Sequence, residues 1–452
     1  MSHSHAKKRR LFLLGSAISV LSLVVSVLPS SANTKEVGVS ATEIVLGMQL
    51  PQSGPASPGY NKIDDAMRAY FDYVNSKGGV NGRKIRLEVR DDEYKAGKTI
   101  STLSSLINRD KVFAMVGSVG TQTQISVIAD LNRRKIPHIF VNSGYSGFYT
   151  SPTKYPNTFG GLGTYVVEAK ILGKYLKETY PGKKIGIIYQ TDDFGRNVVA
   201  GLADQGLTFE KNKTAATFIA GTHGTLGLAN QVKVMKDNGI EIVIFSAVAS
   251  ATAVALSTAA QLQYKPEKWA VISVGSDATT FQTILGARGV AAAVSASFLK
   301  GVLSASHAPS PGDEEDEFVK KFKEINAEFN KADARGKAWD NNVLHGMNIA
   351  YQTVHALYGT EKEYKSLTRA NLIKYLENFG SKIPSAAFAP LGYSKSTHEA
   401  FTGFWLGEYD ANLVLQPIGG KRTVYTTDSA KGPISVLNYT RPKLPADAIS
   451  RG

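Results

Sequence analysis

Cysteine is absent from all 452 residues of the chain. Its absence excludes disulfide bonds, thiolate metal sites and a cysteine nucleophile. It also excludes a lipid-modified cysteine that would anchor an exported protein to a membrane. Any site in this protein must therefore be built from hydroxyls, carboxylates, amides, aromatic rings and the backbone.

Long apolar runs are also scarce, and the one that stands out runs from Leu11 to Leu28. Four basic residues, 7–10, precede it, and Ser30-Ser31-Ala32 follow it. A basic segment, an apolar segment and small residues in this order are typical of a cleaved secretion signal. We therefore predict a signal peptide over residues 1–32, cleaved near Ala32, and a mature protein in the periplasm or released outside a single-membrane cell. A retained anchor is the alternative, because the run is about long enough to span a bilayer.

The chain has no block of charge of one sign outside that signal. The formal net charge is +14, and removing four basic residues and no acidic ones with the signal lowers it to +10. The remaining Lys and Arg residues are interspersed with acids, as in residues 320–324 (KKFKE). A nucleic-acid binder would gather its cations on one helix or arm. The pattern predicts a solvated surface and no nucleic-acid partner.

The sequence shows no recognisable catalytic or metal-binding pattern. No histidine pair has the i, i+4 spacing of a zinc site, and no segment joins a nucleophile with a base and an orienting group. The acidic run Asp91-Asp92-Glu93 fits either a cation site or a solvated strand end, and Asp192-Asp193 leaves the same choice. We expect no enzyme activity, no catalytic residue, no metal and no cofactor. An exported hydrolase that uses these carboxylates is the alternative.

Apolar periodicity predicts alternating strands and helices in the first part of the chain. The expected strands are 43–50, 84–90, 112–116 and 136–141, and the expected helices are 63–74, 97–109 and a helix that begins near Thr121. Such βαβ alternation requires a parallel sheet that is covered by helices.

The same alternation begins again after residue 165. The expected strands are 184–189, 241–245 and 269–274, and the expected helices are 165–179, a helix that follows Gly195 and ends near Gln205, 231–238 and 252–262. Two successive α/β units predict an α/β fold with two doubly wound, Rossmann-like lobes. A polar loop over 304–316, helices at 317–330, 341–358 and 367–380, and two terminal strands follow. The tail 421–452 is either packed on the surface or disordered.

The segment Val112–Leu131 carries the clearest sign of a binding site. A buried strand ends at Gly117-Ser118-Val119-Gly120, and a helix starts at Thr121-Gln122. Glycines let a ligand approach the backbone, and the unpaired N–H groups of a first helical turn attract anions. With hydroxyls at Ser118 and Thr121 and no nearby Lys or Arg, the turn predicts a site for a small carboxylate. The alternative is that Thr121 only caps the helix.

Several motifs together resemble the type I periplasmic solute-binding proteins of ABC importers, in the leucine/isoleucine/valine-binding group. The resemblance covers about residues 43–415, and the spacing of its GGVNGRKI and DDFG runs makes the pair specific. The motifs are Ser53-Gly54-Pro55, residues 78–85 (GGVNGRKI), Asp91-Asp92, Val116-Gly117, Ile136-Pro137, residues 189–195 (YQTDDFG) and Gly275-Ser276-Asp277.

This resemblance implies two lobes joined by a three-strand hinge that close over one small ligand. We expect residues 40–158 with 302–390 to form lobe 1, residues 159–301 with 391–420 to form lobe 2, and 421–452 to be a C-terminal tail. It also implies a monomer that delivers its ligand to the permease of an ABC importer at the membrane. A sensor that presents the ligand to a membrane receptor is the alternative.

The resemblance further implies the residues of the site. A ligand carboxylate would bind Ser118, Thr121 and Gln122, and also Ser143, Gly144 and Tyr145. Phe194 would pack on the ligand, Asp277 would accept its ammonium group, and Tyr60 would cover its side chain. Helix capping by Asp277, and core packing by Tyr145 or Phe194, are the alternatives for these residues.

The chain departs from the pattern of amino-acid binders at four places that concern the ligand. Only one hydroxyl stands in Gly120-Thr121-Gln122, phenylalanine replaces tyrosine at Phe194, Phe159-Gly160-Gly161 replaces an Arg-Thr pair, and residues 246–249 (SAVA) lack an aromatic. A branched-chain amino acid is therefore the first expectation, and an amide, urea or an aromatic acid is the alternative.

Overall fold

The computed structural model describes residues 36–332, 338–427 and 432–452. The predicted signal peptide, residues 1–32, lies outside the described residues. Within them, no helix is long and apolar enough to cross a membrane.

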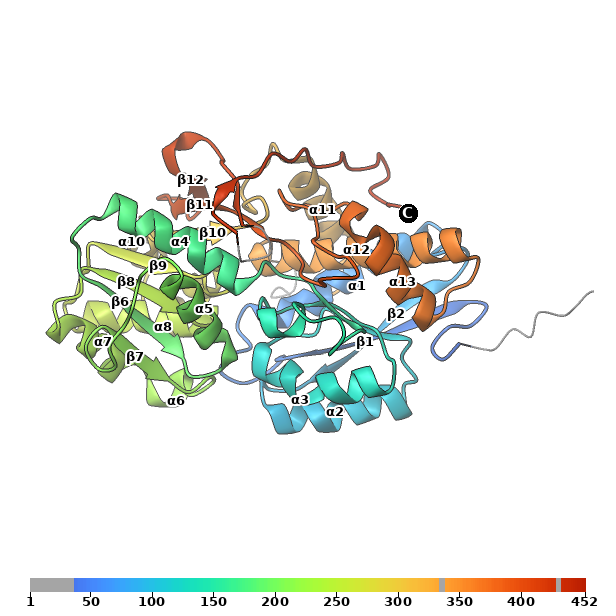
Figure 1. Cartoon of the computed structure of the whole chain (residues 1–452), viewed down its shortest axis with the longest axis horizontal. Coiled ribbons are helices and arrows are strands. Elements are labelled where there is room, and N and C mark those ends of the chain that lie inside the picture. The colour runs from blue at the N-terminus through green and yellow to red at the C-terminus, as the bar shows by residue number, and fades with distance from the viewer. Residues whose placement is uncertain (1–35, 333–337, 428–431) are drawn as a thin grey trace, which may run out of the picture. The chain divides into compact units, whose positions relative to one another are not determined.

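A five-stranded parallel sheet forms the first lobe, in the order β2-β1-β3-β4-β5. Helices α2 and α3 lie on one side of β1, and α1 and α12 lie on the other (Figure 1). The strands are β1 (Glu43–Leu50), β2 (Lys84–Asp91), β3 (Ala114–Val116), β4 (His138–Val141) and β5 (Thr158–Gly160). The helices are α1 (Ile63–Ser76), α2 (Ala96–Asn108), α3 (Thr121–Arg133), α11 (Glu317–Phe329), α12 (Asn341–Tyr364) and α13 (Arg369–Phe379), with the 3-10 turn η1 (Tyr60–Lys62) before α1.

The second lobe repeats this order of strands, β7-β6-β8-β9-β10, and the antiparallel strand β11 follows. Its strands are β6 (Ile185–Gln190), β7 (Ala215–Phe218), β8 (Ile242–Ser246), β9 (Lys268–Val271), β10 (Leu303–Ser306), β11 (Gly403–Tyr409) and β12 (Leu415–Pro417). Its helices are α4 (Tyr165–Thr179), α5 (Asp193–Ala203), α6 (His223–Leu226), α7 (Ala229–Asp237), α8 (Ala249–Gln261), α9 (Ala278–Ala287) and α10 (Ala292–Leu299).

Both faces of the second sheet are buried, which explains its continuous apolar strands. Ile187 and Ile244 pack towards α4 and α5, whereas their neighbours Ile188 and Phe245 pack towards α7 and α8. In both lobes the strand order reverses beside the first strand, between β1 and β3 and between β6 and β8. Ligands of doubly wound sheets bind beyond the carboxyl ends of the strands at such a reversal. A ligand site is therefore expected at the loops after β1, β3, β6 and β8.

The described chain crosses between the two sheets at three segments, after β5, after β10 and before β11. These segments are hydrogen-bonded to one another: Gly160 N–H donates to the His398 carbonyl at 3.0 Å, and Phe388 N–H donates to the His307 carbonyl at 2.8 Å. They form the three-strand hinge that the family resemblance implies.

The described residues of the C-terminal tail, 421–427 and 432–452, pack on both lobes. Strands β13 (Tyr425–Thr426) and β14 (Ser435–Val436) extend the second sheet from β11. Further on, the tail packs on the first lobe, where the hydroxyls of Tyr70 and Tyr73 donate to the carbonyls of Ala448 and Asp447, each at 2.6 Å. Ile449 is buried with the core of that lobe. Of the two alternatives for the tail, the structure has the packed one.

Five strands were not expected from the sequence. β7 lies in a stretch that looked polar and Gly-rich, and β10 begins at Leu303 and overlaps the expected loop 304–316. β5 is only three residues long, and β13 and β14 are two residues long each. Such short or small-residue strands have no readable period, and their pairing partners alone define them.

Candidate functional site

The turn between β3 and α3 has the geometry that its glycines suggested. Gly120 has φ of 107°, and a Cβ there would lie 2.7 Å from the ring of Tyr94. Gly120, and not Thr121, is the N-cap, and no side chain caps the helix. The Thr121 hydroxyl instead lies 2.8 Å from that of Ser143. The first turn of α3 thus keeps amides and two paired hydroxyls on the side of the next loop.

Ser118 lies beneath this turn and is fully buried. Its Oγ accepts a hydrogen bond from the Gln49 N–H at 3.2 Å, and its carbonyl accepts one from Asn142 N–H at 2.9 Å. The residue therefore ties the ends of β1, β3 and β4 together, and its hydroxyl keeps its own proton available as a donor.

Ser143, Gly144 and Tyr145 form the loop after β4. The Gly144 carbonyl accepts the N–H of Tyr165 at 2.9 Å, and a Cβ at 144 would lie 2.3 Å from the Gly163 carbonyl. Only glycine fits there, so this loop is held directly against the N-terminus of α4. The ring of Tyr145 is half-buried and meets Phe148 edge-on at 5.1 Å.

The second lobe contributes Phe194 and Asp277. Phe194 is buried, and its ring lies 4.4 Å from that of Tyr165. Asp277 is the N-cap of α9, where its Oδ2 accepts both the N–H and the hydroxyl of Thr280. The capping alternative for Asp277 is therefore realised, and one carboxylate oxygen is committed to the helix.

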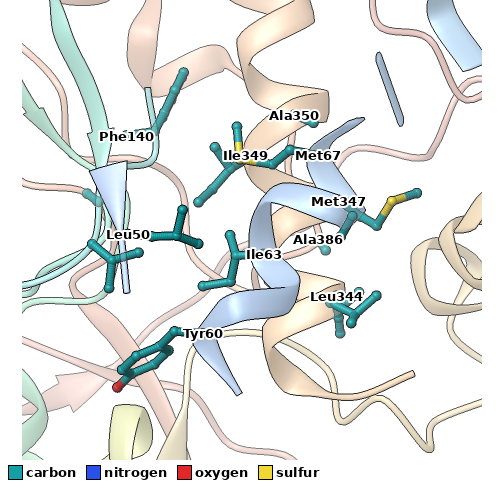
Figure 2. Close-up of a cluster of buried hydrophobic side chains, with 14 of the residues drawn as sticks. Leu50, Tyr60, Ile63, Met67, Phe140, Leu344, Met347, Ile349, Ala350 and Ala386 are labelled. Carbon is teal, nitrogen blue, oxygen red and sulfur yellow. The ribbon is translucent and has the colours of Figure 1, made fainter. Parts of the chain in front are cut away.

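Tyr60 joins the two lobes at the base of the cleft. Its hydroxyl donates to the Val274 carbonyl at 3.1 Å, and burial, Tyr165 and Asp277 raise its pKa above the ordinary value. Figure 2 shows the ring at the edge of the α1–α12 core, with its hydroxyl directed away from Ile63 and Met67. Tyr60 is thus a neutral donor that faces the second lobe.

Two further cross-lobe contacts close the cleft elsewhere. The Gln122 side chain donates from Nε2 to Oδ2 of Asp193 at 3.0 Å. Asn197 in α5 donates to the Ser146 hydroxyl at 2.9 Å and accepts the Ser146 N–H at 3.2 Å. The lobes therefore meet directly through the loops that carry the candidate residues.

Two tyrosines belong to this cleft although the sequence did not single them out, and Asp192, one of the two acids that the sequence left between a cation site and a solvated strand end, lies with them. Burial and then the nearby charges of Asp192 and Tyr60 raise the pKa of Tyr94 well above its ordinary value. Tyr165 contacts both Gly144 and Phe194. Asp192 caps α5, its Oδ1 accepting Gly195 N–H at 3.2 Å, and burial raises its pKa. Tyr94 lies in the loop after β2 and Asp192 in the loop after β6, at the carboxyl ends of the strands, and this position could have indicated Tyr94.

A buried ion pair lies at the lobe interface beside Asp277. Lys62 in η1 is paired with Asp340, the N-cap of α12, and both side chains are almost fully buried. Burial and the nearby carboxylate of Asp277 raise the pKa of Asp340 above its ordinary value, against the opposing effect of Lys62. Among the described residues, no group of three or more His, Asp or Glu side chains could hold a metal ion.

The structure places most of the candidate residues in two groups. Thr121, Ser143, Gly144 and Tyr145 adjoin one another, and Phe194 meets them through Tyr165. Tyr60 and Asp277 line a single cavity at the base of the cleft.

A family model described as "Periplasmic binding protein" matches residues 43–413. The chain belongs to this family of solute-binding proteins.

Individual relatives are distant. An "Amino acid binding protein" of Pseudomonas aeruginosa is 26% identical over 163 residues, which are 36% of this chain and 42% of that protein. "Leu/Ile/Val-binding protein homolog 7" of Brucella melitensis biotype 1 is 24% identical over 319 residues, 68% of this chain and 74% of the relative. The chain thus matches less than half the length of the first relative and about three quarters of the second.

Two solved structures share the fold. A branched chain amino acid ABC transporter protein from Thermus thermophilus, with bound valine, superimposes with a TM-score of 0.71 at 17% identity, over 87% of this chain and 99% of that one. A fatty acid ABC transporter substrate-binding protein from Thermomonospora curvata superimposes with a TM-score of 0.72 at 20% identity. The match covers 90% of this chain and 97% of that one. At these identities the likeness concerns the two-lobed fold.

Proposed function

We propose that this protein is the extracytoplasmic solute-binding component of an ABC importer. It captures a small carboxylate-bearing ligand, such as a branched-chain amino acid, by closing its lobes, and it delivers the ligand to the membrane permease. The paired hydroxyls of Thr121 and Ser143 at the start of α3 carry this proposal. The names of the Leu/Ile/Val-binding relatives support the ligand class.

The ligand carboxylate would lie at the N-terminus of α3. Backbone amides there, with the hydroxyls of Thr121 and Ser143, are donors, and the helix end favours a negative charge. Charge-assisted hydrogen bonds contribute about 1.5–3 kcal/mol each. Three of them, less the cost of ordering and closure, are compatible with a Kd near about 1 μM, which corresponds to about −8 kcal/mol.

The second lobe would complete the site on closure. Tyr165 and Phe194 form an aromatic wall beside Gly144. The cross-lobe bonds of Gln122, Ser146 and Tyr60 are available only when the lobes meet, so they would stabilise the loaded form. A permease that recognises the joined surface of both lobes would then distinguish loaded from empty protein.

A ligand without an amino group is the second candidate. The capping role of Asp277 favours it, because an oxygen that accepts two bonds from Thr280 is less available to an ammonium group. One structural neighbour is named a fatty acid ABC transporter substrate-binding protein, and a fatty acid carries no amine.

A matched pair of ligands tests the proposal. Leucine and 4-methylpentanoate differ only in the amino group, and binding of either raises the apparent stability by mass action. We expect at least one to raise the Tm and to bind with a Kd in the micromolar range by calorimetry. Thr121→Val with Ser143→Ala should abolish that binding. Unchanged affinity in the double variant would show that the ligand carboxylate does not bind at the first turn of α3. Turnover of either compound by the purified protein would favour the hydrolase alternative.

A further inference from the structure

A cavity of about 100 Å³ lies at the base of the cleft, where the chain crosses between the lobes. Tyr60 and Asp277 from the candidate site line it on one side, and two histidines line it on the other. His307 follows β10 in the hinge, and His345 projects from α12. Leu344 and Ala386, at the edge of the α1–α12 core, form part of its apolar wall (Figure 2).

Aromatic packing holds the ring of His307 in one orientation. It stacks on Phe401 at 4.8 Å with an interplanar angle of 16°, and it meets Phe404 edge-on at 5.9 Å. The ring is 9% exposed, and the rings of His307 and His345 are 6.5 Å apart and nearly perpendicular. The two imidazoles are therefore fixed side groups of the cavity.

Each of these rings has a buried nitrogen without a hydrogen-bond partner in the described part of the chain. These atoms are Nδ1 of His307 and Nε2 of His345. An unpaired buried polar atom is costly, and native proteins pair such atoms with solvent or a ligand. The other buried histidine of α12, His355, is paired with Ser450 and Tyr375. Buried nitrogens of His138, His223 and His398 also lack a partner in the described chain, so what distinguishes His307 and His345 is that both residues line the cavity.

Both imidazoles are neutral at physiological pH. Burial lowers the pKa of His307 to about 4 and that of His345 to about 3, with His307 adding to the effect on His345. A neutral imidazole has one N–H donor and one acceptor nitrogen. The pair therefore suits neither a carboxylate nor an ammonium group, and it matches an uncharged group that both donates and accepts.

We propose that this two-histidine pocket, His307 and His345, binds an uncharged hydrogen-bonding group, a hydroxyl or an amide, at the distal end of the ligand. The inference rests on the proposed function, in which the acid group of the ligand is held at α3. It makes these histidines determinants of specificity within the proposed class of small carboxylate-bearing ligands: they favour a polar side chain over the branched aliphatic side chain that was given above as the example.

Two nearly isosteric pairs of ligands test the pocket, namely threonine with valine and asparagine with leucine. We expect wild-type protein to bind the polar member of a pair at least tenfold more tightly in calorimetry. His307→Phe, which keeps the stack on Phe401, and His345→Leu should each reverse that order. If valine and leucine bind as tightly as threonine and asparagine or more tightly, and both variants keep that order, the pocket does not select a polar group. The proposed function would then remain intact.

A second measurement covers the case in which none of the four amino acids binds. Protein labelled with ¹⁵N-histidine is titrated with acetamide, and the signals of His307 and His345 are assigned from the two variants. Saturable shifts of these signals, with the paired His355 unmoved, support the pocket although the proposed amino-acid ligand fails. Absence of such shifts, or shifts of all three histidines alike, shows that the cavity holds water only and overturns the inference.

Discussion

Gln122 in the first lobe donates a hydrogen bond from Nε2 to Oδ2 of Asp193 in the second lobe, and the two atoms are 3.0 Å apart. Both residues occupy the first turn of a helix, α3 and α5, so the bond joins two helix N-termini that face each other across the cleft. It forms only when the lobes are together. The bond therefore connects the proposed carboxylate site at the start of α3 with closure of the two lobes.

Gln122→Ala should weaken ligand binding without lowering stability. A net loss of about 0.5–1.5 kcal/mol for one hydrogen bond corresponds to a two- to tenfold higher Kd. The Kd is measured by calorimetry with leucine or 4-methylpentanoate, whichever binds the wild-type protein more tightly. Gln261→Ala, at the exposed end of α8, is the matched control and should leave the Kd unchanged. An equal Kd in both variants would show that the bond does not favour the loaded form.

Two substitutions of Asp277 separate its structural role from a role in binding. Asp277→Ala removes the cap of α9 and should destabilise the protein by about 0.5–2 kcal/mol. Asp277→Asn keeps a capping oxygen and loses the charge, so its unfolding free energy should stay within about 0.5 kcal/mol of wild type. If Asp277 accepts an ammonium group, the Asn variant should bind leucine more than tenfold more weakly and 4-methylpentanoate equally well. Equal loss for both acids would exclude that role.

Glu168 in α4 should make stability depend on pH. It is fully buried, accepts bonds from the N–H and hydroxyl of Ser273 at 2.6 and 2.8 Å, and burial raises its pKa from 4.5 to about 7. Between these values the folded state binds more protons than the unfolded state, so this carboxyl makes folding less favourable as pH rises. Above about pH 7 its penalty is constant.

Glu168→Gln removes that titration and keeps partners for Ser273. The unfolding free energy of the variant minus that of wild type should therefore increase from pH 4.5 to pH 7 and then level off. Urea denaturation at pH 4.5, 6 and 8 measures this difference, in which all other titrating groups cancel. A difference that stays flat, or decreases, over this range would contradict a raised pKa.

Ile449 should be a stabilising residue although it lies three residues from the end of the chain. Its side chain is 2% exposed and packs in the core of the first lobe. Ile449→Ala should lower the unfolding free energy by about 2–5 kcal/mol, the usual cost of such a truncation in a core. Val436→Ala, in the same tail but 64% exposed, should change it by less than about 0.5 kcal/mol. Similar values for both would mean that the tail is not docked in solution.

The sequence was sufficient to predict the architecture and much of the cleft. Strong apolar periods located α1 and α4, and a short apolar run next to glycines located β3 and its turn. The loops at strand ends were then certain to meet, because parallel strands present their carboxyl ends at one edge. That rule predicts that the loops after β3 and β4 lie at one edge, whereas the family resemblance named Ser143 as a partner of Thr121 in the site.

The remainder depended on contacts between residues far apart in sequence. The hydroxyl of Tyr60 could not be assigned to Val274 because they are 214 residues apart. The pairing of Lys62 with Asp340 and the cavity beside His307 depend likewise on how the hinge segments pack. Whether the tail packs on the surface could not be predicted for the same reason, because its polar, Pro-containing sequence has only a few residues that become buried, such as Ile449.

The docked tail has a kinetic consequence. A hinge of three segments permits the lobes to swing apart, but the tail adds a tether that is paired with β11 at one end and fixed to α1 by the hydroxyls of Tyr70 and Tyr73 at the other. Full opening must stretch this tether or detach one of its ends. The residence time of a captured solute is thus coupled to the last residues of the chain, and a tag fused to Gly452, which packs against Gly359, would shorten it.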